Sequence, residues 1–257
     1  MHPRPVAALI AILLASPVAA AEFVLAYVGP EDSAALQGVQ LGIEESNVQG
    51  EFLGVKLALK RSEGKTVPKE AIAVFAARPG AVGRLSSGLA GKAVFNLSDD
   101  DDELRAACLG NALHVYPSAR MKADAVKQWA ERNPGTRVSA AAWHPDAVKF
   151  AARDLNKRYK ERFGAPMDEL AWAGWFSARA VGDTLMREWN EDAASLLRSL
   201  KEADGLDGQK GDPHSFRASG QLRQPLVLVG PDGALLGEAP VRGAPGGLDS
   251  LGSSPCE

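Results

Sequence analysis

The sequence predicts an α/β fold that consists of one α/β lobe and an abridged, mostly helical second lobe. Three observations support this prediction. Up to Tyr116, short apolar runs alternate with stretches of helical periodicity, as in a parallel sheet with crossover helices. After Pro117 the periodicity is mainly helical. From Asp204 onward, glycine, proline and aspartate become frequent, which is typical of loops and turns.

The N-terminus has the pattern of a secretory signal peptide. A basic start at Arg4 precedes an apolar run over 6–15 and small residues that end at Ala21, and the run is too short for a membrane span. We expect cleavage after Ala21, or alternatively after Ala20. Cleavage after Ala21 leaves 257 − 21 = 236 residues and, because Arg4 is lost, changes the formal net charge from −3 to −4. The sequence therefore predicts an exported, periplasmic protein without membrane insertion after cleavage.

Residues 22–117 are the predicted N-terminal lobe. Strands are expected at four apolar runs, namely 23–28, 55–59, 92–97 and 113–116. A helix is expected from Pro68, where proline can occupy the first turn, to Pro79-Gly80, which would end it. The strands at 23–28 and 55–59, with the helix expected between them, form a strand, helix, strand unit from which a parallel sheet can be built.

The first helix of this lobe is expected to begin after Glu31-Asp32-Ser33, whose side chains can cap it, and to run to about Ser46. Within it, Gly38 and Gly42 lie one turn apart. Paired glycines at this spacing indicate close packing, and we expect that packing to be against a sheet.

Residues 118–203 are the predicted second lobe, and 204–257 are a C-terminal segment whose tail returns to the first lobe. The chain is expected to change lobe at Pro117-Ser118, with Ser118 as the candidate N-cap of the next helix. The expected elements are helices at 122–131, 145–163 and 168–189, and strands at 138–143 and 226–229. The run Gly230-Pro231-Asp232-Gly233 then predicts a turn or hairpin.

The chain has two cysteines, Cys108 and Cys256. In an oxidising compartment an isolated pair is expected to be joined, and a disulfide would hold the C-terminal tail against the first lobe. The chain-entropy model credits a closed loop of this length with roughly 4 to 5 kcal/mol. Two unpaired thiols remain the alternative, because spacing alone does not establish connectivity.

Several function classes lack support in the sequence. The mildly acidic charge with interspersed signs argues against nucleic acid as a partner. Gly64-Lys65-Thr66 resembles the end of a phosphate-binding loop, but Leu59 stands where that motif requires glycine. Ser62 and Lys65 have the spacing of an acyl-transfer motif without its companion motifs. The scattered histidines provide neither a zinc site nor a catalytic triad; they are His114, His144 and His214. We therefore expect no catalytic residues and no metal ligands.

The acidic run 99–103 permits two interpretations. Its carboxylates could coordinate a hard cation, although the run lacks the glycine and the terminal glutamate of a calcium loop. It also lies at a predicted helix start, where carboxylates cap free amides and interact favourably with the helix dipole. Capping is the preferred interpretation.

The tryptophans divide into two groups. Trp172, Trp175 and Trp189 recur along one helical stripe, which indicates core positions. Trp143 instead ends a strand-like run and precedes His144-Pro145, at the kind of strand end where open α/β sheets bind ligands. Trp143 is therefore a candidate pocket wall, with a core position as the alternative.

Two arginines, Arg217 and Arg223, lie in the polar segment SFRASGQLRQP. Their planar guanidinium groups can bind a carboxylate in two-point contact. The alternative is a structural role in salt bridges or exposure to solvent.

With these residues in view, the chain resembles the type I periplasmic solute-binding proteins, the Leu/Ile/Val-binding class. More narrowly, it resembles the exported substrate-binding family associated with PQQ-dependent alcohol dehydrogenase systems. The matching blocks follow the order of the family over most of the chain, at 94–108, 113–129, 142–159, 171–183 and 215–228, then LDSLG followed by Cys256.

The resemblance implies two Rossmann-like lobes joined by a hinge, with a small ligand between them and no catalysis. It implies PQQ or a small organic acid as ligand, no required cofactor, and an ABC permease or a PQQ-dependent dehydrogenase as partner. One departure favours a different function: between Trp129 and Thr136, where the family has several units of its second lobe, only AERNPG is present. A ligand-free accessory protein of an alcohol dehydrogenase system is therefore the alternative.

The predicted ligand-binding residues are Tyr27, Ser118, Trp143, Arg217 and Arg223. Tyr27 and Ser118 are included because they end strands at the expected cleft, with ordinary strand-end packing as the alternative. An aromatic wall with arginines would suit a planar tricarboxylate such as PQQ.

Overall fold

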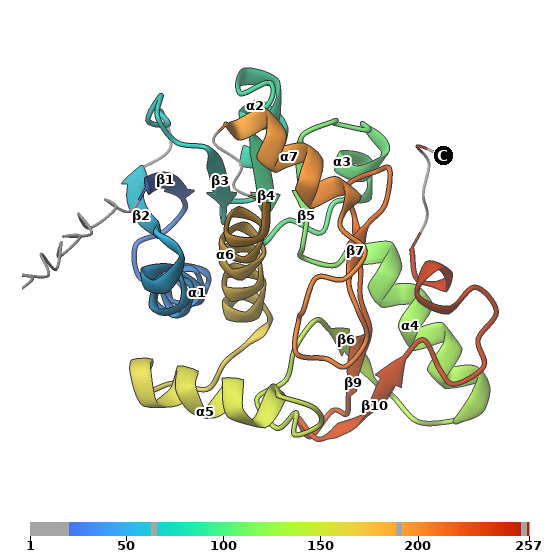
Figure 1. The fold of residues 1–257 in the computed structure, drawn as a ribbon. Helices are drawn as coiled ribbons and strands as arrows, with labels where there is room; N and C mark the ends of the chain where they lie inside the picture. The colour runs from blue at the N-terminus through green and yellow to red at the C-terminus, as the bar shows by residue number, and fades with distance from the viewer. Residues whose placement is uncertain (1–20, 63–65, 189–191, 253–255, 257) are drawn as a thin grey trace, which may run out of the picture.

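The computed structural model describes residues 21–62, 66–188, 192–252 and 256. They form a five-stranded parallel sheet with flanking helices and, beside it, a three-stranded antiparallel sheet (Figure 1). The expected signal peptide lies outside the described residues except for Ala21, so its cleavage stays a prediction. Within the described residues, no helix is long and apolar enough to cross a membrane.

The large sheet has the strand order β2-β1-β3-β4-β5, and all of its strands are parallel. Its strands are β1 (Ala21–Val28), β2 (Val55–Ser62), β3 (Ala73–Ala76), β4 (Ala93–Asn96) and β5 (Ala112–His114). The central strands β3 and β4 are buried at every position. This explains their continuous apolar sequence, because helices cover both faces of a parallel sheet.

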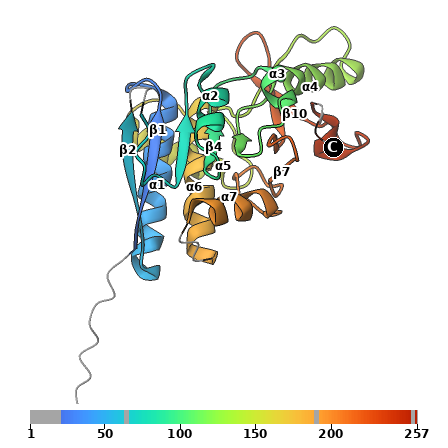
Figure 2. The same ribbon diagram turned by 90° about the horizontal axis from the view of Figure 1, so that it is seen from above.

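Helices lie on both sides of this sheet (Figure 2). Its helices are α1 (Ala34–Leu53), α2 (Ala81–Gly88), α3 (Asp102–Ala106), α6 (Glu169–Glu188) and α7 (Ala193–Glu202). On one face, Leu25, Phe75 and Phe95 share a core with α1, α6 and α7. On the other face, Val74 and Val94 pack against α2 and α3. We call this unit the first lobe.

The close packing expected at Gly38 and Gly42 is confirmed, but its partner is α6 and not the sheet. A Cβ atom at Gly38 would collide with the backbone of Ala171, and one at Gly174 would collide with the backbone of Ala35. The two helix backbones therefore touch, which only glycine permits at these positions.

The second lobe consists of the antiparallel sheet and one helix packed on it. Its elements are β6 (Ser139–Ala141), β9 (Leu226–Val229), β10 (Leu235–Ala239) and α4 (Ala119–Arg132). The strand order is β10-β9-β6, and β9 and β10 form the expected hairpin. Its small core joins Met121 and Ala125 of α4 to Leu226, Leu228 and Leu251.

The remaining elements connect the lobes or extend from them. They are α5 (Ala152–Phe163), β7 (Ser215–Phe216), β8 (Leu222–Arg223) and a short 3-10 helix, η1 (Gly247–Ser250). In Figure 1, α5 lies below α1 and α6, and its buried residues Leu155 and Tyr159 join the core of the first lobe.

The prediction of a helix from Pro68 to Gly80 is wrong. Residues Ala73–Ala76 form the central strand β3, and the next helix begins at Ala81. A short apolar run does not by itself distinguish a buried strand from a buried helix turn. In the folded protein this run pairs with β1 on one side and β4 on the other, so it forms a strand.

The predicted range of the second lobe, 118–203, also differs from the division that the packing of the helices shows. Helices α6 and α7 belong to the first lobe, where α6 packs along the length of α1. Thirteen residues of α6 are buried, so the helix needs partners on most of its surface, and the small second lobe does not provide them. The second lobe is thus a small sheet with α4 rather than a mainly helical unit.

The expected disulfide between Cys108 and Cys256 is present, with Cα atoms 5.8 Å apart. Cys108 follows α3 of the first lobe, and Cys256 lies in the tail that follows the second lobe. The bond therefore ties the end of the chain back to the first lobe, as the sequence predicts.

Candidate functional site

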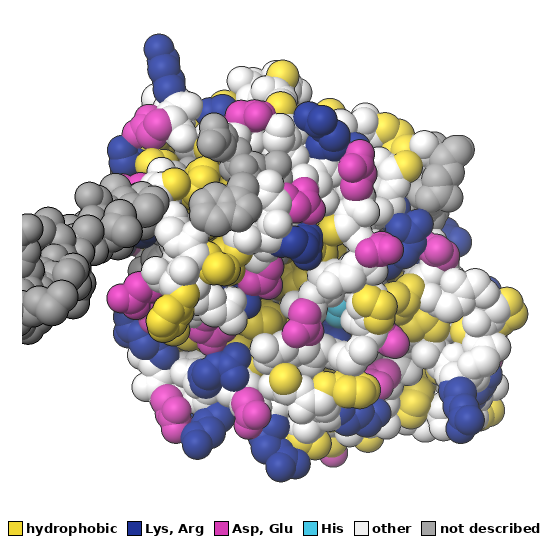
Figure 3. Space-filling view, in the orientation of Figure 1, with side chains coloured by type: hydrophobic (Ala, Val, Ile, Leu, Met, Phe, Trp, Pro, Cys, Tyr) yellow, Lys and Arg dark blue, Asp and Glu magenta, His cyan; other side chains and the backbone are white. Residues whose placement is uncertain are grey.

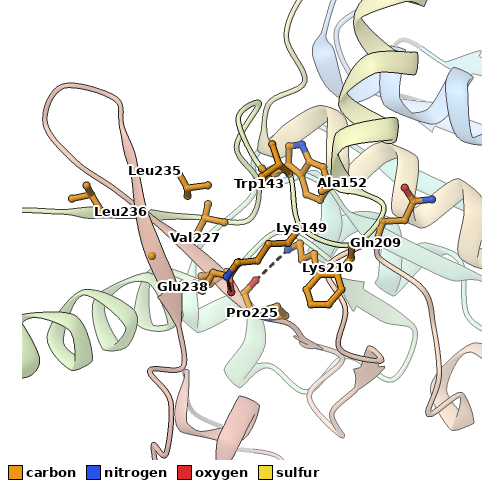
Figure 4. A pocket seen from close by; sticks show the side chains of 15 residues that line it. Trp143, Lys149, Ala152, Gln209, Lys210, Pro225, Val227, Leu235, Leu236 and Glu238 are labelled. Atoms are coloured by element: carbon orange, nitrogen blue, oxygen red, sulfur yellow. Dashed lines mark hydrogen bonds and ion pairs between the residues drawn. The ribbon is translucent and has the colours of Figure 1, made fainter.

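A pocket of about 210 Å³ lies between the segment 147–150 and the β9–β10 hairpin. Its walls are mainly apolar and include Trp143, Phe150 and Val227. Figure 4 shows these elements around the pocket, and the space-filling view in Figure 3 shows basic and acidic side chains interspersed over the face seen in Figure 1. Binding pockets for small molecules combine such walls with a few polar groups.

Trp143 forms one wall of this pocket and is also part of the core. It follows β6, is 3% exposed, and lies stacked on Trp172 with ring centroids 6.0 Å apart. Its indole Nε1 donates a hydrogen bond to Asn156 Oδ1 (2.8 Å). Trp143 therefore lies both on the wall of the pocket and in the core, and its contact with a ligand stays a prediction.

Asn156 holds the turn that shapes the pocket. Its Nδ2 donates to the carbonyl oxygens of Pro145 (2.8 Å) and Ala147 (3.1 Å), while its Oδ1 accepts from Trp143. One side chain on α5 thus fixes both the wall and the segment that closes the pocket. The sequence carries no signal for this role, because a polar residue on a charged helix resembles a solvated one.

Lys210 is half-buried and supplies an amine to the wall of the pocket. Its Nζ donates to Gln224 Oε1 (2.8 Å) and to the carbonyl oxygen of Pro225 (3.2 Å), and it lies 3.5 Å from the centroid of the Trp172 ring. Burial lowers the pKa of the Lys210 ammonium well below its usual value, and the negative charges of Glu169 and Glu238 oppose this shift. An anion bound beside Nζ would favour the charged form.

A second amine lies at the mouth of the pocket. Lys149 Nζ pairs with Glu238 Oε2 at 3.1 Å, and both side chains are exposed (Figure 4). Two lysines and one glutamate thus line the pocket among the described residues, and a bound anion would favour the protonated form of Lys210.

Two predicted ligand residues have structural roles at strand ends. Tyr27 is buried, and its hydroxyl lies 2.5 Å from Ser33 Oγ and donates to the carbonyl oxygen of Pro30. Ser118 is also buried, and its Oγ caps α4 by accepting the amide N–H of Met121 (3.1 Å). The structure thus shows the strand-end packing that was the alternative for both.

Arg217 and Arg223 converge on one carboxylate of the protein itself. Their Nε atoms donate to Asp249 Oδ1 at 3.1 and 2.7 Å. The Nη2 of Arg217 also donates to the carbonyl oxygens of Leu248 and Leu251, both at 2.8 Å. The two guanidinium groups therefore hold η1 and the tail beside it, as the structural alternative proposed, and neither lies among the pocket-lining residues that the structure describes.

The acidic run 99–103 caps helices, as expected. Asp99 Oδ2 accepts the N–H of Gly80 before α2 (2.8 Å), and Asp101 caps α3. Asp102 Oδ2 accepts the N–H of Arg120 at the start of α4 (3.1 Å). Across the described ranges, no cluster of three or more histidine, cysteine or carboxylate side chains is placed to hold a metal ion.

The expected core tryptophans Trp172 and Trp175 are buried, while Trp189 lies outside the described residues. Trp172 Nε1 donates to the carbonyl oxygen of Gly208, and Trp175 Nε1 donates to Glu45 Oε2. The stripe therefore joins α6 to the loop before β7 and to α1.

Solved structures show which known proteins share this fold. An ABC transporter substrate-binding protein from Desulfitobacterium hafniense aligns at TM-score 0.71 and 12% identity, over 84% of this chain and 100% of the other. A branched-chain amino acid ABC transporter periplasmic ligand-binding protein from Burkholderia xenovorans aligns at TM-score 0.68 and 11% identity, over 89% and 96%. A solute binding protein of an ABC transporter from Rhodopseudomonas palustris, in complex with 3,4-dihydroxybenzoic acid, aligns at TM-score 0.66 and 9% identity, over 84% and 97%.

These likenesses establish the fold, which is α/β and like that of the type I periplasmic binding proteins. The comparisons at the sequence level add nothing to this, since no protein-family model and no curated protein matches the chain.

Proposed function

We propose that this protein is a non-enzymatic, periplasmic solute-binding protein that holds a small organic acid in the pocket beside Trp143. One observation carries the proposal: an apolar pocket has the amine of Lys210 on its wall. The shared fold with substrate-binding proteins of ABC transporters supports it. In this proposal, Lys210 binds the carboxylate of the ligand, and Trp143 and Val227 contact its apolar part.

The volume of the pocket indicates the size of the ligand. A cavity of about 210 Å³ is small and accommodates a compact ligand. Such a space suits a branched aliphatic acid or a single-ring aromatic acid. The complex of the Rhodopseudomonas palustris protein with 3,4-dihydroxybenzoic acid makes that acid a suitable first probe.

PQQ is the second candidate ligand, and delivery to an ABC permease or to a PQQ-dependent alcohol dehydrogenase is the proposed biological context. The resemblance of the sequence supports this context. PQQ has three fused rings and three carboxylates, so it would need a wider pocket than the one described. The small acid is therefore our first choice.

The proposal is tested by titrating the purified protein with 3,4-dihydroxybenzoate, leucine and PQQ while tryptophan fluorescence is recorded. We expect saturable quenching by the aromatic acid. Lys210→Met should raise the Kd about ten- to a hundredfold, because a hydrogen bond to a charged group contributes about 1.5 to 3 kcal/mol. Lys157→Met, on the exposed face of α5, serves as the matched control and should leave the Kd unchanged.

Absence of a saturable response to all three ligands, in protein that melts cooperatively, would reject the proposal. A response to PQQ alone would identify PQQ, and not the small organic acid, as the ligand.

Two observations favour a second function, that of a ligand-free accessory protein. The arginines expected to bind a ligand are bound to Asp249, and the second lobe has a sheet of three strands among the described residues. This function predicts stable co-purification with a quinoprotein dehydrogenase and no ligand-induced change in the melting temperature.

A further inference from the structure

Three donors converge on the carboxylate of Glu169. The hydroxyl of Tyr116 donates to Oε1 at 2.5 Å, and Lys122 Nζ donates to the same oxygen at 3.0 Å. The backbone N–H of Ala142 donates to Oε2 at 2.9 Å. Both carboxylate oxygens are therefore bound by the protein.

These donors come from both lobes. Glu169 is the first residue of α6 in the first lobe, whereas Lys122 lies on α4 of the second lobe. Ala142 directly follows β6, which is also in the second lobe, and Tyr116 is the last residue before the crossover at Pro117. The carboxylate thus bridges the lobes at the point where the chain passes between them.

The donor set has the chemistry of a carboxylate-binding site. It combines a hydroxyl, an ammonium and a backbone amide, and each makes a charge-assisted hydrogen bond to the anion. Burial and the neighbouring Glu169 carboxylate raise the pKa of Tyr116, so its hydroxyl stays protonated and remains a donor. Lys122 Nζ also donates to the Tyr116 hydroxyl (3.0 Å) and lies 4.3 Å from the centroid of its ring, which connects the donors to one another.

The site is also open to small solutes. The side chains of Lys122 and Glu169 retain 21% and 20% of their exposure, so water and small ions can reach the carboxylate. If the Glu169 carboxylate were removed, its donors would form a ready-made site for a free monocarboxylate.

We propose that the junction of the two lobes is a carboxylate-binding site that the protein fills with its own Glu169. The side chain acts as an internal ligand and keeps the lobes joined without a bound solute. Solutes then bind at the separate pocket beside Trp143. The inference goes beyond the proposed function and does not depend on it, because all of its contacts lie within the chain.

The test is replacement of the internal ligand by a free one. Glu169→Ala removes the methylene and the carboxylate, and acetate supplies the same two carbons and the same charge. We expect the variant to melt at least about 6 °C lower than the wild type, because it loses three charge-assisted bonds in a chain of this size. Added sodium acetate should restore most of that loss in a saturable manner, whereas sodium chloride at equal ionic strength should not.

Glu169→Gln is the matched control, because it keeps the volume and leaves no space for acetate. Acetate should change neither its melting temperature nor that of the wild type. Equal effects of acetate on all three proteins, or no effect on the folded alanine variant, would overturn the proposal.

A second variant keeps the proposal testable if Glu169→Ala does not fold. Lys122→Ala removes one donor from an accessible position and should lower the melting temperature by about 3 °C or more. Lys127→Ala, on an exposed turn of the same helix, should change it by less than about 1 °C. Equal shifts for the two lysine variants would contradict a bridge between the lobes at Glu169.

Discussion

The two lobes of this molecule are stabilised in different ways. The first lobe has a five-stranded sheet with helices on both faces, and its central strands are buried at every position. The second lobe has a three-stranded sheet with α4 on one face, and β6 and β10 keep exposed positions. A small unit buries a smaller share of its apolar surface, so it depends more on other interactions.

Those other interactions are present at the end of the chain. The Cys108–Cys256 disulfide and the pairing of Arg217 and Arg223 with Asp249 both attach the C-terminal segment to the first lobe and the elements next to it. Gln128 on α4 adds a hydrogen bond from Nε2 to Ser250 Oγ at 2.9 Å. Apolar burial thus stabilises the large lobe, while covalent and polar links hold the small one in place.

The largest effect is expected from the helix crossing in the first lobe. Gly38→Val would force a side chain into the backbone of Ala171, and we expect the free energy of unfolding to fall by about 4 kcal/mol or more. Urea denaturation measures this loss. Gly88→Val is the matched control, because Gly88 has open space around it and lies at the end of α2. Similar losses at both glycines would show that the crossing is not a critical contact.

The next effect concerns the covalent link of the C-terminal segment. Reduction of the disulfide should lower the free energy of unfolding by about 2 to 4 kcal/mol, because the reduced unfolded chain gains conformational freedom. The measurement is a denaturation curve with and without reductant. The double variant Cys108→Ser, Cys256→Ser should behave like the reduced protein and should not respond to reductant. Equal stability of the wild-type protein with and without reductant would show that the disulfide does not stabilise the fold.

The smallest effect is a pH dependence that arises in the first lobe. Burial, with smaller contributions from the charges of Arg105 and Lys210 respectively, lowers the pKa of His114 and His214 to about 3. In the unfolded chain these two histidines bind protons near pH 6.5, whereas in the folded protein they stay neutral down to about pH 3. Their neutral form therefore stabilises the fold fully above pH 6.5, and this stabilisation is lost as the pH falls from 6.5 toward 3. We expect a loss of about 2 kcal/mol between pH 7.0 and 5.5.

Urea denaturation at the two pH values tests this expectation. His214→Leu should roughly halve the loss, because the side chain lies among the rings of Trp172 and Phe176, and neither ring nitrogen has a hydrogen-bond partner among the described residues. Lys157→Met, on the exposed face of α5, should leave the loss unchanged. An equal loss of stability in all three proteins would show that the pH dependence does not arise from His214.

Much of the fold was predictable, because its signals are local. The apolar runs at β1, β4 and β5, the cap at Ser118 and the hairpin after β9 follow from the type and spacing of neighbouring residues. The run at β3 was assigned to a helix because four apolar residues fit both structures. Its identity depends on strands that lie elsewhere in the chain.

The candidate site was predictable only in part. Trp143 was identified because it ends a strand, which is a local signal. Lys210 lies in a loop of glycine and aspartate and was missed, since its partners Gln224 and Trp172 become neighbours only after folding. Glu169 was missed for a similar reason, because a glutamate at a helix start resembles an ordinary capping residue.

Local sequence patterns were sufficient to predict the α/β class, the positions of most strands and helices and the capping role of the acidic run. They also showed a cysteine pair suited to a disulfide. Three features depend on contacts between distant parts of the chain: α6 belongs to the first lobe, Arg217 and Arg223 bind Asp249, and Lys210 lines a pocket. The physical reason is the range of the interactions. Hydrophobic periodicity and capping act over a few residues and are visible in the sequence, whereas partners separated by dozens of residues meet only when the chain has folded.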